Sequence, residues 1–189
     1  MKWTYVLAGT GGVMFSLWMG WGIYLITTTA RPAYMVVEAL SSNIEIRQYE
    51  DQTHISAAQN GDNASFMVLA SYIFGRNKEE QQVAMTAPVI TDERMSFILP
   101  EGLTPEEAPM PDGQSIDFTR VPARRLATLQ FSWLTTTKRV EAKTRMLLET
   151  LEVKGIETVG RPFLMRYNDP WTPPFMRRNE VAVEVRSSV

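Results

Sequence analysis

Alternation of apolar and polar residues predicts short β-strands through most of the chain after residue 30. Residues 44–49 read Ile-Glu-Ile-Arg-Gln-Tyr, the alternation that a half-buried strand requires. The same pattern predicts further strands, with 115–121 and 125–131 expected to pair with each other. The predicted strands are 34–39, 44–49, 53–59, 88–91, 95–99, 115–121, 125–131, 163–167 and 181–185.

Two segments have the period of an α-helix instead. In residues 64–74, Phe66, Leu69, Ala70 and Ile73 fall at i, i+3, i+4 and i+7 on one face, and Gly75 supplies a C-terminal stop. A second, longer helix is expected after three threonines at 135–137, ending at Gly155. Its buried stripe is predicted to consist of Val140, Thr144, Leu147, Leu148 and Leu151.

The order of these elements is strands, helix, strands, strands, helix, strands. Each helix is followed by strand pairs, which predicts an α+β fold of two similar halves that form one antiparallel sheet or distorted barrel. At 189 residues the chain is long enough for one domain with a sizeable core and short for two, and this domain is expected over residues 31–189.

The first 30 residues have a different pattern. From Trp3 to Ile26 there are 24 consecutive residues without a charge, and a helix of that length would be roughly 36 Å long, enough to cross a ~30 Å hydrocarbon core. This predicts an uncleaved transmembrane anchor over residues 1–30. A cleaved signal peptide is the alternative, since Thr28-Thr29-Ala30 resembles a cleavage site, but the apolar run is longer than usual for one.

The charges that flank this segment are nearly balanced, with Lys2 on one side and Arg31 on the other. A two-residue leader is most simply left in the cytoplasm. We therefore expect a single-pass membrane protein whose folded domain is exported, to the periplasm in a bacterium.

A stripe of small residues recurs every four positions along this segment: Ala8, Gly12, Ser16 and Gly20. Small residues at this spacing allow a second membrane helix to approach closely, which indicates a partner transmembrane helix. The alternative is that Gly and Ala are simply frequent in membrane helices.

Composition excludes several classes of protein. The net charge of −2 leaves no excess of Lys and Arg to cover nucleic-acid phosphates. The chain has no Cys and a single His, so thiolate chemistry, disulfides and multi-histidine metal sites are excluded. It also lacks a Gly-x-Ser-x-Gly elbow for a nucleophilic serine. We therefore expect a binding protein and no enzyme.

Four segments resemble the signature segments of the SOUL haem-binding protein family in order and spacing: residues 72–77 (YIFGRN), 83–89 (VAMTAPV), 95–100 (MSFILP) and 167–181 (YNDPWTPPFMRRNEV). The resemblance covers residues 34–185. It implies a distorted antiparallel barrel with two helices, and binding of haem or another tetrapyrrole in an apolar groove beside the first helix.

A porphyrin is an apolar plate with two carboxylates, so it needs an apolar floor and cations at the rim. The predicted floor consists of Phe66, Met67, Ala70, Ile73, Phe74 and Met85. The predicted rim cations are Arg76, Lys78, Arg177 and Arg178, since guanidinium groups bind carboxylates bidentately. The alternatives are that the helix face belongs to the core and that Arg178 pairs with Glu180 to fix the last strand.

The sequence departs from the family pattern at the iron ligand. Some relatives carry a histidine where this chain has Gln48, and basic residues where it has Asn63 and Ser71. His54 is the remaining candidate ligand, against the alternative of an ordinary strand histidine. Met67 and Met85 are less favoured thioether candidates. We expect haem, if bound, to be held by burial with weak or absent axial coordination.

These observations predict a membrane-anchored, non-enzymatic tetrapyrrole-binding protein that acts as a carrier, buffer or accessory module. The alternative is a structural accessory subunit of a membrane complex that kept the fold without the ligand, using the small-residue stripe. An enzyme acting on a small molecule in the same groove ranks third.

Overall fold

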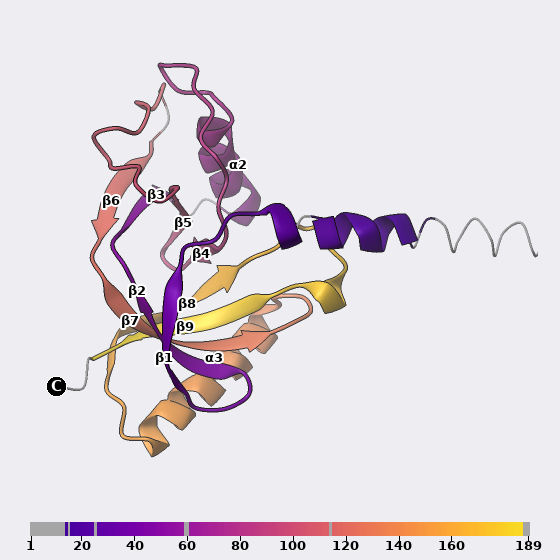
Figure 1. The fold of residues 1–189 in the computed structure, drawn as a ribbon, viewed down its shortest axis with the longest axis vertical. Coiled ribbons are helices and arrows are strands. Elements are labelled where there is room, and N and C mark those ends of the chain that lie inside the picture. The colour runs from indigo at the N-terminus through magenta and orange to yellow at the C-terminus, as the bar shows by residue number, and fades with distance from the viewer. Residues whose placement is uncertain (1–13, 15, 25, 59–60, 114, 187–189) are drawn as a thin grey trace, which may run out of the picture.

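The computed structural model describes residues 14, 16–24, 26–58, 61–113 and 115–186. Nine antiparallel strands form one curled sheet in the order β1-β2-β7-β9-β8-β4-β5-β3-β6 (Figure 1). Because chain order and sheet order differ, the first and second halves of the chain are interleaved in the centre of the sheet. The strands are β1 (Tyr34–Ala39), β2 (Ile44–Tyr49), β3 (Gln52–Ala58), β4 (Val89–Thr91), β5 (Arg94–Ile98), β6 (Asp117–Val121), β7 (Arg124–Phe131), β8 (Thr158–Arg166) and β9 (Asn179–Val185).

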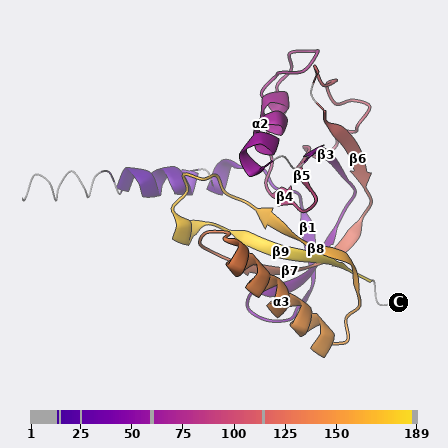
Figure 2. The same cartoon turned by 180° about the vertical axis from the view of Figure 1, so that it is seen from behind.

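Two α-helices cover different parts of this sheet, as Figures 1 and 2 show from opposite sides. Helix α2 (Asp62–Ile73) packs on β3 and β5, and α3 (Thr137–Val153) packs on β7, β8 and β9. A short 3-10 turn, η1 (Pro174–Met176), lies in the loop between β8 and β9. The α+β class and the curled antiparallel sheet predicted from the sequence are confirmed.

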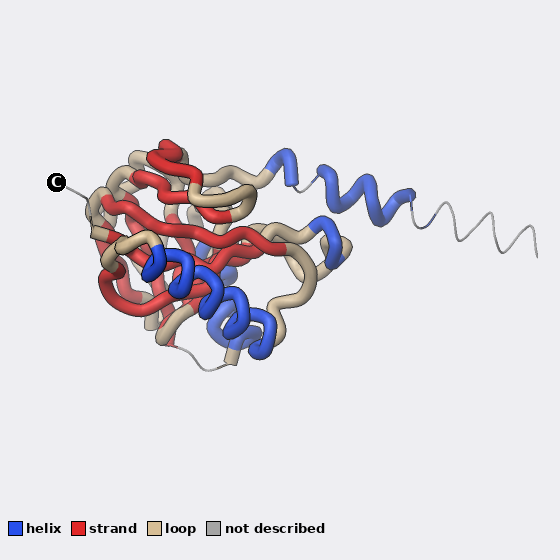
Figure 3. The backbone as a smooth tube through the Cα atoms, turned by 90° about the horizontal axis from the view of Figure 1, so that it is seen from below, coloured by secondary structure: helices blue, strands red, loops and turns tan. Residues whose placement is uncertain are grey.

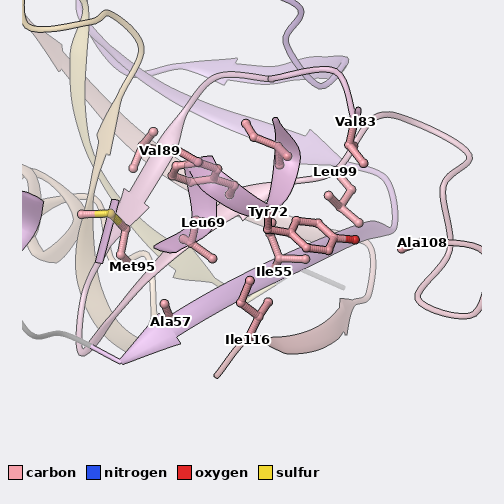
Figure 4. Close-up of a cluster of buried hydrophobic side chains, with 13 residues drawn as sticks. Ile55, Ala57, Leu69, Tyr72, Val83, Val89, Met95, Leu99, Ala108 and Ile116 are labelled. Atoms are coloured by element: carbon pink, nitrogen blue, oxygen red, sulfur yellow. The ribbon is translucent and has the colours of Figure 1, made fainter. Parts of the chain in front are cut away.

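The core is divided in the same way as the helices. Under α2, the buried side chains of Leu69, Tyr72 and Ile55 pack with Met95 and Leu99 from the strands (Figure 4). Under α3, the fully buried Leu147 and Leu151 pack against Ile46, Leu129 and Val183. Each helix therefore buries its own apolar face on its own strands, which is why both were recognisable from periodicity.

One predicted pairing is wrong. Segments 115–121 and 125–131 were expected to pair, but β6 pairs with β3 and β7 pairs with β2 and β9. Pro122 and Ala123 join the two strands at a corner, where the Asp51 carboxylate accepts hydrogen bonds from the Ala123 amide and the Arg120 guanidinium. This corner sends the chain into another part of the sheet.

Strand β8 begins at Thr158, five residues before the strand predicted at 163–167. The apolar–polar alternation is lost there because the pairing of β8 with β9 shifts register between Val159 and Phe163. Gly160 sits within this irregularity with a φ of 71°, a value that glycine adopts without strain.

The N-terminal segment is helical over 16–24 and 26–28 and projects away from the domain (Figures 1 and 3). Within the described residues, no helix is long and apolar enough to span a bilayer. Half of the predicted anchor, including Ala8 and Gly12 of the small-residue stripe, lies outside those residues; Ser16 and Gly20 lie in the helical part.

Candidate functional site

A cavity of about 380 Å³ opens beside the N-terminal end of α2. Its walls come from α2, from the segment leading into β4, from the β7–α3 corner and from the β8–β9 loop. Its lining includes six apolar side chains: Phe66, Met85, Ala87, Val89, Met95 and Trp133. Four aromatic or thioether side chains among them, Phe66, Trp133, Met85 and Met95, offer polarizable surface, which suits a planar apolar ligand.

The core holds these walls in place. The ring of Phe66 lies 5.3 Å from the Phe97 ring of β5, centroid to centroid. Thr86, next to Met85, donates its hydroxyl hydrogen bond to the Ile98 carbonyl, and this contact fixes the extended segment before β4. Met85 itself stays 37 % exposed, so its thioether stands at the cavity edge.

Two arginines of the β8–β9 region line the same cavity. Arg177 donates from Nε to the Thr172 carbonyl at 2.8 Å and from Nη2 to the Pro170 carbonyl at 2.6 Å. A guanidinium has five N–H groups, and within the described residues no acceptor is bonded to Nη1 of Arg177. Arg177 therefore braces the loop and still has donors for a ligand carboxylate.

Arg166 is the second arginine of the cavity. It donates to the Asp62 carboxylate at 2.8 Å and to the Thr91 hydroxyl at 2.9 Å. Arg166 was not among the predicted site residues, although it is the one arginine in the otherwise apolar segment 163–167, which was a usable signal. Trp133 was also missed; its signal was a large aromatic residue in the polar segment after a strand.

Arg178, next in the chain to Arg177, lies in a different environment. Its Nε and Nη2 donate to Glu180 Oε1 at 2.9 and 2.6 Å. Glu180 is fully buried and also accepts from Arg47 Nη1 and Tyr167 Oη, both at 2.8 Å. We call Arg47, Tyr167, Arg178 and Glu180 the Glu180 junction; it joins β2, β8 and β9.

The junction shifts the pKa values of its members. Burial is the largest single influence and would lower the pKa of the Arg178 guanidinium, but the charge of Glu180, the neighbouring Tyr167 and the hydrogen bonds to Tyr34 and Glu180 together leave that pKa raised. Burial, assisted by the negative charge of Glu180, raises the pKa of Tyr167 well above its usual value. The junction is therefore charged and internally paired, and its guanidinium groups are occupied by Glu180.

His54 lies on β3 and lines neither this cavity nor the second one described below. It is buried, and its Nε2 sits 3.0 Å from the acceptor Oε1 of Gln52. Burial, with a smaller contribution from the charge of Arg124, lowers the pKa of His54 to about 4. The imidazole is thus neutral and separate from the cavity beside α2.

The other predicted site residues divide between core and surface. Ala70 and Ile73 are buried in the core cluster under α2. Met67 and Phe74 point to solvent from the outer face of α2, and Arg76 is exposed beyond its C-terminal end. The structure thus brings Phe66, Met85 and Arg177 together at the cavity, and places the other predicted residues outside its lining.

A second cavity, of about 400 Å³, lies on the other side of Thr86. It has no aromatic side chain in its lining, and its charged groups include Glu50, Asp51 and Glu101 beside two arginines. Acidic groups oppose an anionic ligand. The lining of the cavity beside α2 also includes two carboxylates, Asp62 and Asp169, but Asp62 accepts from Arg166 and Asp169 accepts from the β8–β9 loop. With these carboxylates bonded and with aromatic walls, it is the better site for a flat, apolar anion.

Comparisons with known proteins agree with the fold. The C-terminal domain of EcmrR superimposes with a TM-score of 0.53 at 13 % identity, covering 82 % of this chain and 99 % of that one. A chain of an EcmrR–DNA complex gives a TM-score of 0.56 at 11 % identity, covering 77 % of this chain and 57 % of that one. These similarities concern the fold alone.

A search of curated proteins gives no match. The family model described as "SOUL heme-binding protein" matches residues 29–184, which include α2, α3, strands β1 to β8, all but the last residue of β9, and the whole cavity lining. The chain belongs to the SOUL heme-binding protein family.

Proposed function

We propose that the protein binds haem or a related tetrapyrrole in the cavity beside α2 and serves as a membrane-anchored carrier or buffer. The observation that carries the proposal is an arginine with unused donors, Arg177, at the edge of an aromatic-walled cavity in a domain of this family. The volume of about 380 Å³ lies toward the lower end of ligand sites, roughly 300–1,000 Å³. A plate as large as a porphyrin would keep one edge at the mouth.

The lining favours a binding mode without histidine. His54 is outside the cavity, so the thioethers of Met85 and Met95 are the neutral metal-ligand candidates in the wall. Burial of the plate against Phe66 and Trp133, and pairing of a propionate with Arg177, would then supply most of the affinity. This mode predicts that the metal-free porphyrin binds about as well as hemin.

Hemin titration of the full chain in mild detergent, followed at the Soret band, tests the proposal. Saturable binding in the low micromolar range is expected. Asn63→Trp would place an indole at the cavity mouth from the exposed first turn of α2, and should weaken binding by about tenfold, equivalent to 1.4 kcal/mol.

Met67→Trp is the matched control, since Met67 is exposed one turn further along α2 and does not line the cavity. It should leave hemin affinity unchanged, as should His54→Asn. Absence of a saturable Soret shift in the parent chain, or equal effects of the two tryptophan variants, would contradict binding at this cavity.

The membrane anchor is the second part of the proposal. It is supported by the 24 uncharged residues from Trp3 to Ile26, of which residues 3–13 precede the described helical turns. We propose that Lys2 remains in the cytoplasm and the domain is exported. Labelling of Val153→Cys in intact cells with a membrane-impermeant maleimide checks the side, because the native chain has no cysteine.

A structural accessory subunit is the second candidate. Gly20 favours it, since a Cβ added there would meet nothing within 4 Å among the described residues, which leaves room at that position for a partner helix. Identification of stoichiometric co-purifying subunits, together with a negative hemin titration, would support this role over the carrier.

A further inference from the structure

Four large apolar side chains are exposed at one end of the domain. Trp133 and Leu134 stand at the β7–α3 corner, and Trp171 and Phe175 stand on the β8–β9 loop. Trp171 is 76 % exposed, and the Trp133 and Phe175 rings lie 6.4 Å apart, centroid to centroid. We call these four residues the apolar tip. An exposed group of this kind, drawn from two loops, marks an interaction surface.

The N-terminal helical segment joins the domain at this tip. Trp18 donates its indole hydrogen bond to the Trp171 carbonyl at 2.7 Å. A Cβ on Gly22 would lie 3.0 Å from Pro173 Cδ, so the helix backbone is close against the β8–β9 loop. Figures 1 and 3 show the segment leaving the domain next to η1. The tip is thus continuous with the uncharged run of the sequence.

The residues around the tip identify the occupant as a lipid surface. Tryptophan and tyrosine concentrate at the membrane interface, where an apolar ring with one polar group is favoured, and the helical segment adds the exposed Trp21 and Tyr24. Two exposed cations, Lys138 and Arg139, follow the tip in the chain. The nearby Asp169 carboxylate is turned inward, accepting from the Trp171 and Thr172 amides and the Thr172 hydroxyl.

The cavity beside α2 opens at the same end. Trp133 belongs to both the tip and the cavity lining, and Pro170, which precedes Trp171, also lines the cavity. Thr29, at the end of the N-terminal helical turns, lies on the cavity as well. A ligand that passes the tip would therefore enter the cavity without crossing another part of the domain.

We propose that the apolar tip is seated in the interface of the membrane that holds the N-terminal segment, and that the cavity exchanges its apolar ligand directly with the lipid phase. This inference rests on the proposed anchor and ligand. Apolar rings in such a surface contact are buried a few ångströms into the headgroup region. Anionic headgroups would meet Lys138 and Arg139.

The native chain has no cysteine, so single nitroxide labels can report depth. Phe175→Cys and Val153→Cys are compared in the full chain reconstituted into phosphatidylcholine vesicles containing phosphatidylglycerol. Val153 is 86 % exposed at the C-terminal end of α3 and is the matched water-exposed position. The label at 175 should be relaxed by oxygen more than by a water-soluble nickel chelate, and the label at 153 should show the reverse.

Flotation of the same vesicles separates the possible failures. If the protein does not float with the lipid, the anchor and the seated tip are both wrong. If it floats but the label at 175 is as accessible to the chelate as that at 153, the anchor stands and the seated tip is wrong. A label at 175 shielded from both reagents would indicate a protein partner and would also overturn the proposal.

Ligand exchange is tested with hemin preloaded into the vesicles. The double variant Trp171→Ser/Phe175→Ser changes two residues outside the cavity lining. It should slow transfer of hemin from vesicles several-fold while leaving hemin affinity in detergent unchanged. An unchanged transfer rate would overturn exchange through the tip; loss of affinity in detergent as well would assign these residues to the binding site instead.

Discussion

The cavity beside α2 and the Glu180 junction are built from the same kinds of residue but differ in what their arginines bind. At the junction, Arg47 and Arg178 pair with a buried carboxylate of the protein, and their guanidinium groups lie 4.4 and 4.3 Å from the ring centroids of Tyr34 and Tyr167. At the cavity, Arg166 is also paired with a carboxylate, Asp62, whereas Arg177 meets only backbone carbonyls among the described residues. At the junction, the protein itself supplies the carboxylate, so the arginines there stabilise the fold. At the cavity, no protein carboxylate pairs with Arg177 among the described residues, so this arginine is suited to binding a carboxylate of a ligand.

Glu180→Ala should have the largest effect, and it tests whether the Glu180 junction stabilises the fold. The change would leave Arg47, which is 3 % exposed, as a buried charge with only Glu45 as a carboxylate partner. Removing one partner of a buried ion pair costs about 3–5 kcal/mol. Urea unfolding of the full chain in detergent, followed by tryptophan fluorescence, should show a loss of this size.

Glu184→Ala is the matched control on the same strand. Glu184 forms a 3.5 Å contact with Arg124 and is 37 % exposed, so its removal should cost no more than about 1 kcal/mol. Equal losses for the two variants would mean that the junction contributes no more to stability than a surface ion pair.

His54 extends the comparison to a buried ionisable group with no carboxylate beside it. Its pKa of about 4 in the folded protein is below the value of about 6.5 expected when the chain is unfolded. The unfolded state therefore binds the extra proton between these pH values, so stability should fall as the pH drops from 6.5 to 4. The loss approaches about 3 kcal/mol at pH 4.

Unfolding curves of the parent chain and His54→Gln between pH 7 and pH 4 measure this contribution. Protonation of carboxylates in acid destabilises the parent and the variant alike. The difference between their two curves of stability against pH therefore measures the contribution of His54. The parent should lose more stability than the variant over this range. Parallel curves would mean that the imidazole is already protonated or exposed in the folded state.

The same comparison explains which features were accessible from the sequence. The stripe of α3 contains Leu147 and Leu151, both fully buried, because a helix on the edge of a core has one apolar face. Helix α2 was located correctly, but it is apolar on more than one side, with Met67 and Phe74 exposed. Periodicity therefore identified α2 without showing which of its residues reach the cavity.

The sequence also could not show which arginine faces the cavity and which pairs with a buried carboxylate. Arg177 and Arg178 are neighbours in the chain, and their different roles depend on where Glu180, Arg47 and Tyr167 lie in space. Trp133 reaches the cavity from the β7–α3 corner with a φ of 77°. Such a conformation is uncommon for a large side chain and leaves no periodic signal.

Arg177→Gln and Arg178→Gln test the comparison with the smallest change, at two adjacent residues. Arg178→Gln removes charge-assisted hydrogen bonds to a fully buried carboxylate, so it should cost about 1.5–3 kcal/mol of stability and leave hemin affinity unchanged. Arg177→Gln loses hydrogen bonds to two backbone carbonyls, those of the buried Thr172 and the exposed Pro170. It should cost about 1 kcal/mol of stability, less than Arg178→Gln, but it should weaken hemin binding by about tenfold. Soret titration and urea unfolding of both variants give the four values. Equal changes in hemin affinity for the two variants, or weaker binding in Arg178→Gln alone, would mean that Arg177 is not the arginine that binds the ligand carboxylate. The main argument for an anionic ligand in the cavity beside α2 would then be wrong.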